Sequence, residues 1–121
     1  PEGCRIGRGS ILLRNVTLTA AVTLGSHVVA MPSVTFTHDD DVADFATFGA
    51  GVSLGGGVRV GKAAHLGMNS SVRDRTSVGD YATVGMGAAV LSNVPAGETW
   101  VGVPAHEIDQ HVFTFGKEPS R

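Results

Sequence analysis

The sequence holds few of the residues that mark several common classes of protein. Cys4 is its single cysteine, so no disulfide can form within the chain, and a reduced, cytoplasmic location is the expectation. Lysine and arginine total nine and form no basic block, which argues against a nucleic-acid partner. No apolar run approaches the roughly 20 residues that span a bilayer, and no signal peptide is recognisable, so no membrane partner is expected.

Aromatic residues make up only 6% of the 121 residues, whereas glycine occurs 17 times without forming a low-complexity linker. A chain of this length forms one domain and can bury a core. Few large side chains and many glycines suit a narrow core with tight corners better than an ordinary two-layer domain.

Apolar residues recur at every sixth position from residue 6 to residue 90, without an insertion. With 42% apolar residues and six possible registers, chance would produce such a run on the order of once in 100,000 sequences. A second column, four residues after the first, holds small or β-branched residues at every position except Asp40. The first column consists of Ile6, Leu12, Leu18, Leu24, Ala30, Phe36, Val42, Phe48, Leu54, Val60, Leu66, Val72, Val78, Val84 and Val90.

Each group of six residues is therefore predicted to be a short strand followed by a corner, with both columns pointing inward. Three such hexads close a triangular coil of eighteen residues, and successive coils pair at a spacing of roughly 4.8 Å. Fifteen hexads predict an all-β fold, a parallel β-helix of about five coils stabilised by contacts between neighbouring coils. Glycine follows the apolar residue in eight hexads, where we expect it to permit a bend.

The six-residue period stops after Val90, and Pro95 and Gly97 provide turn residues that end the coils. We divide the chain into a β-helix domain of residues 1–94 and a C-terminal cap and tail of the same domain, residues 95–121. The tail is expected to cover the open end of the last coil, as a short helix or strand. Cys4 falls in the column of small inward residues, so a buried thiol is expected.

The hexads resemble those of the hexapeptide-repeat acyltransferases, over about residues 5–105. The ending of the pattern, residues 84–105, is similar to that of sugar acetyltransferases of this class, except for Asn93 where Asp is common and Trp100 where Val is common. The resemblance implies a left-handed parallel β-helix, a homotrimer with active sites between subunits, and acetyl-CoA as co-substrate without a metal.

His38 is the first candidate for chemistry. It follows the inward Phe36 by two positions, so its side chain points outward, and three aspartates follow it. From the residues alone it is either a surface histidine in an acidic loop or a base whose tautomer a carboxylate fixes. Asp40, placed in the inward column, either distorts the corner beside such a site or forms a bulge without function.

The segment around His38 also resembles a motif of the sialic-acid and bacillosamine-type sugar acetyltransferases. The similarity is carried by Phe36-Thr37-His38-Asp39, Asp44-Phe45 and Gly49-Ala50-Gly51-Val52. It implies that His38 is the catalytic base that deprotonates the amino group or hydroxyl of a sugar, with Asp39 as its supporting acid.

One departure from the family concerns the position nine residues after the base. A second histidine is frequent there and helps to place the thioester region of acetyl-CoA, whereas this chain has Thr47, whose hydroxyl can still donate a hydrogen bond. His65 lies eighteen residues further on, in the same column one coil away. It is a candidate replacement for the absent histidine, or else an exposed or interface residue.

The other residues that we assign to acetyl-CoA follow from the column spacing and from the resemblance. Gly56 lies one coil beyond His38 and is expected to leave room and backbone N–H donors for the thioester. Met68 and Met86, one coil apart, are either plain surface residues or an apolar wall for the pantetheine arm. The resemblance implies that Val103 and Pro104 lie near the adenine end.

The leading hypothesis is an acetyl-CoA-dependent N- or O-acetyltransferase acting on a sugar, in which a nucleotide-linked acceptor is favoured. A metalloenzyme resembling the γ-class carbonic anhydrases would need three converging histidines, and His27, His38 and His65 occupy different columns. A non-catalytic β-helix scaffold or binding protein is the other alternative. Related enzymes carry an N-terminal domain for the nucleotide-linked sugar, which the sequence before Cys4 does not resemble, so the acceptor stays open.

Overall fold

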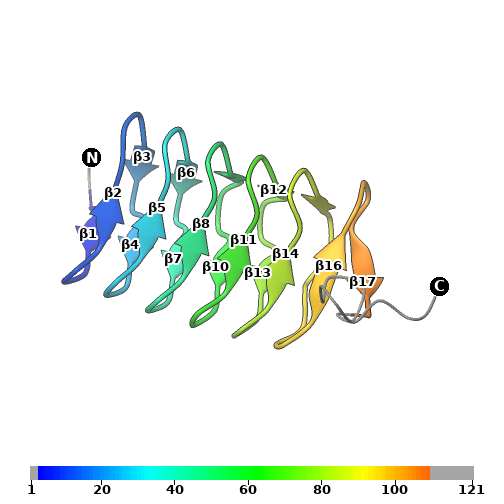
Figure 1. Ribbon diagram of the computed structural model, residues 1–121. Helices are drawn as coiled ribbons and strands as arrows, with labels where there is room; N and C mark the ends of the chain where they lie inside the picture. Colours follow the sequence, from blue (N-terminus) through cyan, green and yellow to red (C-terminus); the bar gives the residue numbers. More distant parts are fainter. Residues whose placement is uncertain (1–2, 110–121) are drawn as a thin grey trace.

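The computed structural model describes residues 3–109, which form a stack of triangular coils without a helix (Figure 1). Each coil contributes one short strand to each of three sheets, and the coils follow one another in chain order. The predicted parallel β-helix of about five coils is therefore confirmed. Within the described residues no helix is long and apolar enough to cross a membrane.

The strands are assigned to a first, a second and a third sheet, in the order in which the chain enters them. The first sheet consists of β1 (Arg5–Ile6), β4 (Thr23–Leu24), β7 (Asp41–Val42), β10 (Arg59–Val60) and β13 (Ser77–Val78). The second consists of β2 (Ile11–Leu12), β5 (Val29–Ala30), β8 (Thr47–Phe48), β11 (His65–Leu66), β14 (Thr83–Val84), β16 (Thr99–Val101) and β17 (His106–Ile108). The third consists of β3 (Thr17–Ala20), β6 (Thr35–His38), β9 (Ser53–Leu54), β12 (Ser71–Val72) and β15 (Ala89–Val90).

Neighbouring strands pair in parallel with a register of one coil, so that Val42 pairs with Val60. The register changes at the C-terminal end, where Val94 bridges to Val78 and Trp100 pairs with Val84. Stacking thus continues past residue 94, in a last coil that is two residues shorter than the others. Strand β17 then pairs antiparallel with β16 and covers the edge of the second sheet. The rest of the predicted tail, residues 110–121, lies outside the described residues.

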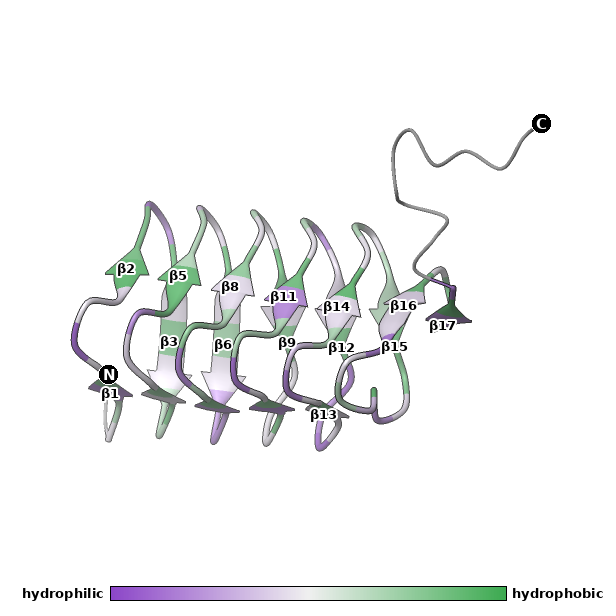
Figure 2. Cartoon of the chain, turned by 60° about the horizontal axis from the view of Figure 1, so that its bottom comes forward, coloured by the Kyte–Doolittle hydropathy of each residue, from purple (hydrophilic) through white to green (hydrophobic). Residues whose placement is uncertain are grey.

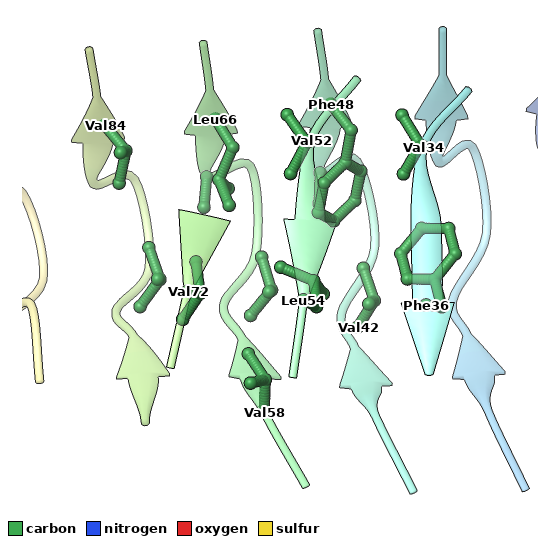
Figure 3. Close-up of a cluster of buried hydrophobic side chains, with 14 of the residues drawn as sticks. Val34, Phe36, Val42, Phe48, Val52, Leu54, Val58, Leu66, Val72 and Val84 are labelled. Carbon is green, nitrogen blue, oxygen red and sulfur yellow. The ribbon is translucent and has the colours of Figure 1, made fainter. Parts of the chain in front are cut away.

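The two inward columns form one continuous core (Figure 3). Its largest side chains, Phe36 and Phe48, meet edge to face with ring centroids 5.1 Å apart. The first coil is less well covered, because no coil lies on its outer side. Ile6 is consequently 52% exposed, and Cys4 is only half-buried rather than buried as expected.

The corners are built on a backbone conformation that recurs every sixth residue. Positions 3, 9, 15 and so on to 87 all have a positive φ, and ten of these fifteen residues are not glycine. The glycines that follow the inward apolar residues therefore do not supply the bend, contrary to the expectation. They are needed for close approach between coils: a Cβ on Gly49 would lie 2.6 Å from the backbone nitrogen of Met68.

Candidate active site

His38 and Asp39 form a hydrogen-bonded pair at the corner between the third and the first sheet, which we call the His38 corner (residues 37–40, 55–58 and 73–76). The His38 Nδ1 atom lies 3.0 Å from Asp39 Oδ2, and both side chains are more than 60% exposed. An ionised carboxylate can only accept, so Nδ1 carries the proton in this contact. In the neutral ring Nε2 is then left unprotonated, which is the state a general base requires.

The imidazole of His38 packs against Gly56, which lies one coil further on. A Cβ built on Gly56 would overlap the Cε1 and Nε2 atoms of His38, so the ring lies directly against this glycine. The amide of Gly57 also donates to the carbonyl oxygen of His38 at 2.8 Å. The space that we expected Gly56 to leave for a thioester is therefore occupied by the ring itself. That Gly56 also contacts the acetyl donor stays a prediction.

Asp40 lies beneath this pair, with only 1% of its surface exposed. Its Oδ1 accepts the amide of Val58 at 2.9 Å, and its Oδ2 accepts the amide of Thr37 at 3.1 Å. Burial raises the pKa of Asp40 to about 6, and the two amides and the nearby His38 oppose this rise. The residue that interrupts the inward column is thus hydrogen-bonded in place rather than part of a loose bulge.

A second feature is an apolar cavity of about 620 Å³ at the corner between the second and the third sheet, which we call the methionine corner. The cavity is open because one outward column, which repeats every eighteen residues, carries Gly49, Gly67 and Gly85 in three successive coils. In the first two coils Leu13 and Met31 fill the same column. The strands of the second sheet also become more polar in this direction, from the green β2 and β5 to the purple β11 (Figure 2). The lining consists of Gly49, His65, Gly67, Met68, Thr83, Val84, Gly85, Met86 and Val101.

His65 places an imidazole in the wall of this otherwise mostly apolar cavity. Its Nδ1 lies 2.8 Å from the hydroxyl oxygen of Thr47, the residue below it in the same column. The hydroxyl can donate or accept, so the tautomer of His65 is not fixed by this contact alone. The predicted column neighbours are therefore in direct contact, and Nε2 is the ring nitrogen not engaged by Thr47.

The structure does not bring all predicted site residues together within one chain. His38, Asp39 and Gly56 share one corner, whereas Met68 and Met86 line the cavity at another, and the third sheet lies between the two. Val103 and Pro104 follow β16 at the C-terminal end, where Val103 is 76% exposed. Thr83 and Val101 also line the cavity and were not predicted from the sequence. Glycine recurs every eighteen residues at Gly49, Gly67 and Gly85, and this spacing was the signal that could have indicated the cavity.

In the part of the chain that the structure describes, no cluster of three or more histidine, cysteine or acidic residues could hold a metal ion. His27 stacks on Phe45 at the corner between the first and the second sheet, with ring centroids 5.3 Å apart. His27, His38 and His65 therefore lie apart from one another, each beside a different residue.

No family model matches the chain, and no curated protein matches it by sequence. Solved structures do match. The protein WeeI from Acinetobacter baumannii AYE is 31% identical with a TM-score of 0.87, over 88% of this chain and 53% of that one. The acetyltransferase domain of PglB from Neisseria gonorrhoeae FA1090, in complex with acetyl coenzyme A, is 29% identical with a TM-score of 0.86, over 88% and 52%.

A third similar structure is a mutant of the GDP-perosamine N-acetyl transferase from Caulobacter crescentus, in complex with CoA and GDP-perosamine. It is 26% identical with a TM-score of 0.87, over 88% of this chain and 51% of that one. This chain thus spans about half the length of each of these three structures.

Fold and hexads together define a β-helix of the hexapeptide-repeat acyltransferase type. One of these structures is an acetyltransferase domain and another a GDP-perosamine N-acetyl transferase, in agreement with the resemblance found in the sequence. The first is in complex with acetyl coenzyme A and the second with CoA, the co-substrate that the resemblance implies.

Proposed function

We propose that this protein transfers the acetyl group of acetyl-CoA to an amino group or hydroxyl of a nucleotide-linked sugar. The observation that carries the proposal is the position of the His38 ring. Asp39 contacts its Nδ1 and Gly56 of the next coil packs against it, which leaves Nε2 to accept a proton. Such a base removes the proton of an attacking nitrogen or oxygen and contributes about 10²- to 10⁴-fold in rate.

Asp39 has a definite part in this step. Once Nε2 has taken the proton, the ring is a cation whose Nδ1–H donates to the carboxylate 3.0 Å away. The carboxylate therefore fixes the tautomer before proton transfer and stabilises the imidazolium afterwards. Because both side chains are exposed in a single chain, this stabilisation is weak until another surface excludes water from the pair.

The acetyl-CoA site is proposed at the methionine corner. A cavity of about 620 Å³ with mostly apolar walls suits a flexible thioester arm. Met68 and Met86 provide adaptable apolar surface, and His65 provides the polar group that can donate from Nε2 to a thioester oxygen.

The two corners are brought together if three copies assemble with their third sheets around a common axis. Neighbouring prisms then meet corner to corner, so the His38 corner of one subunit faces the methionine corner of the next. The outward residues of the third sheet suit a contact surface, since they are small and uncharged: Thr17, Thr35, Ser53, Ser71 and Ala89.

The test is a measurement of CoA release with acetyl-CoA and a panel of nucleotide-linked amino sugars. We expect turnover by the wild type and a loss of about 10²- to 10⁴-fold in His38→Ala. His27→Ala is the matched control, because its ring stacks on Phe45 at a different corner. Near-normal turnover in His38→Ala would refute the assignment of the base, and absence of acetyl-CoA binding to the wild type would refute the reaction.

A further inference from the structure

Three polar residues of the inward column perform the same task. Cys4, Ser10 and Asp40 each accept the backbone amide of the residue one coil further on, at 3.4, 3.0 and 2.9 Å. A thiol and a neutral hydroxyl are sufficient at the first two positions. The need to satisfy one amide therefore does not explain why position 40 carries a carboxylate, which is costly to bury.

Asp40 differs from the other two because its second oxygen is also used. Oδ2 accepts the amide of Thr37, immediately before His38, while Oδ1 accepts the amide of Val58, two residues after Gly56. The Asp40 side chain thus links the end of β6, which carries His38, to the segment of the next coil that contains Gly56. The 2.8 Å bond from the Gly57 amide to the His38 carbonyl reinforces the same junction.

His38 and Asp39 are the ionisable groups that act electrostatically on Asp40. His38 favours its ionised form, and Asp39 opposes it. From the next coil it receives the backbone amide of Val58, and the stem of Arg75 lies beyond Gly57. Since attraction between opposite charges is mutual, an ionised Asp40 stabilises a protonated His38 from below, while Asp39 does so from the side.

We propose that Asp40 is a positioning residue, which holds the His38 ring on Gly56 and supports the imidazolium formed during proton transfer. Its catalytic consequence depends on the proposed acetyl transfer, whereas its effect on the ring does not. The two parts of the proposal can therefore fail separately.

Two substitutions test this role. Asp40→Ser copies the arrangement at Ser10, so it keeps an acceptor for Val58 but loses both the Thr37 contact and the charge. Asp40→Asn removes the charge and has a single acceptor oxygen, so it keeps only one of the two amide contacts. Asp41→Asn is the matched control, because it removes a neighbouring charge from an exposed side chain that makes neither contact.

The first measurement needs no substrate. In the wild type we expect a nuclear Overhauser effect between the His38 ring and the Gly56 Hα protons, because the ring lies against this glycine. The effect should fall by at least about half in Asp40→Ser and be unchanged in Asp41→Asn, since a ring released from its seat samples other rotamers. Wild-type intensity in a folded Asp40→Ser protein would overturn the positioning part.

The second measurement is the kinetics of acetyl transfer. In Asp40→Ser we expect kcat to fall about 10- to 100-fold with the KM of both substrates within about twofold, because a displaced base impairs the chemical step. In Asp40→Asn kcat should also fall with KM nearly unchanged, because one of the two amide contacts and the negative charge are lost.

Wild-type kcat in both variants would overturn the proposal. If Asp40→Ser does not fold, Asp40→Asn decides through its kcat and its ring–Gly56 contact. If the wild type shows no acetyl transfer, the proposed function fails, and the ring–Gly56 contact still tests the role of Asp40.

Discussion

The imidazole of His38 lies against the backbone of Gly56, eighteen residues later in the chain and one coil further along the stack. The proposed base is thus positioned by the absence of a side chain. Its exposed contact with Asp39 alone would not fix it, because hydrogen bonds and ion pairs in water are weak.

Gly56→Ala should therefore impair activity without a large effect on folding. The added Cβ would overlap two ring atoms and lie 2.9 Å from His38 Nδ1, so the ring must leave its seat. We expect kcat to fall at least about tenfold. Gly97→Ala is the control: it has a φ of 75° and no atom within 4 Å of its Cβ, so it should cost about 1 kcal/mol of stability and leave kcat unchanged. Equal kcat values in both variants would contradict this function of Gly56.

Asp40 should make the free energy of unfolding depend on pH. Its folded pKa of about 6 lies above the ordinary value of 3.8, so the folded state binds the proton more tightly than the unfolded state. The associated stability is fully present below about pH 4 and is lost as the pH rises to about 6. The loss is on the order of 3 kcal/mol.

Urea unfolding at pH 4.5 and pH 7.5 measures this effect as a difference between proteins. Asp40→Asn should lack this component of the pH dependence, whereas Asp41→Asn should retain it. An identical change in unfolding free energy for wild type and Asp40→Asn would show that Asp40 is not the titrating group.

His65 should discriminate between acetyl-CoA and CoA. If its Nε2 donates to the thioester oxygen, His65→Ala weakens acetyl-CoA binding about 2- to 10-fold, the value of one hydrogen bond, and leaves CoA binding unchanged. Thr47→Val should produce a smaller change of the same kind, because it only orients the ring. Calorimetry with the two ligands tests this, and an equal effect on both ligands would place His65 elsewhere along the arm.

The proposed trimer, with its site divided between subunits, can be tested with mixed trimers. His38→Ala lacks the base, and Met86→Glu places a charge in the apolar cavity, so each is expected to be inactive alone. After dissociation and reassembly of an equal mixture, about a quarter of the subunit junctions combine an intact His38 corner with an intact methionine corner. Activity should recover to about that fraction of wild type; no recovery in verified mixed trimers would place the whole site within one chain.

The six-residue period alone predicted the β-helix, because each coil can bury its apolar residue only by stacking on identical neighbours. It also predicted that His38 and Gly56, and Thr47 and His65, are column neighbours. These pairs follow from a register of one coil per eighteen residues, which the strands obey from β1 to β15.

Only the tertiary structure decided what those neighbours do. It showed that the ring fills the space at Gly56, that Asp40 binds two amides, and that glycine spacing opens a cavity at a different corner from His38. The period fixes which residues lie above one another, because it sets the register. Side-chain direction and exposure depend on rotamers and on contacts between coils and between corners, which a one-dimensional repeat does not contain.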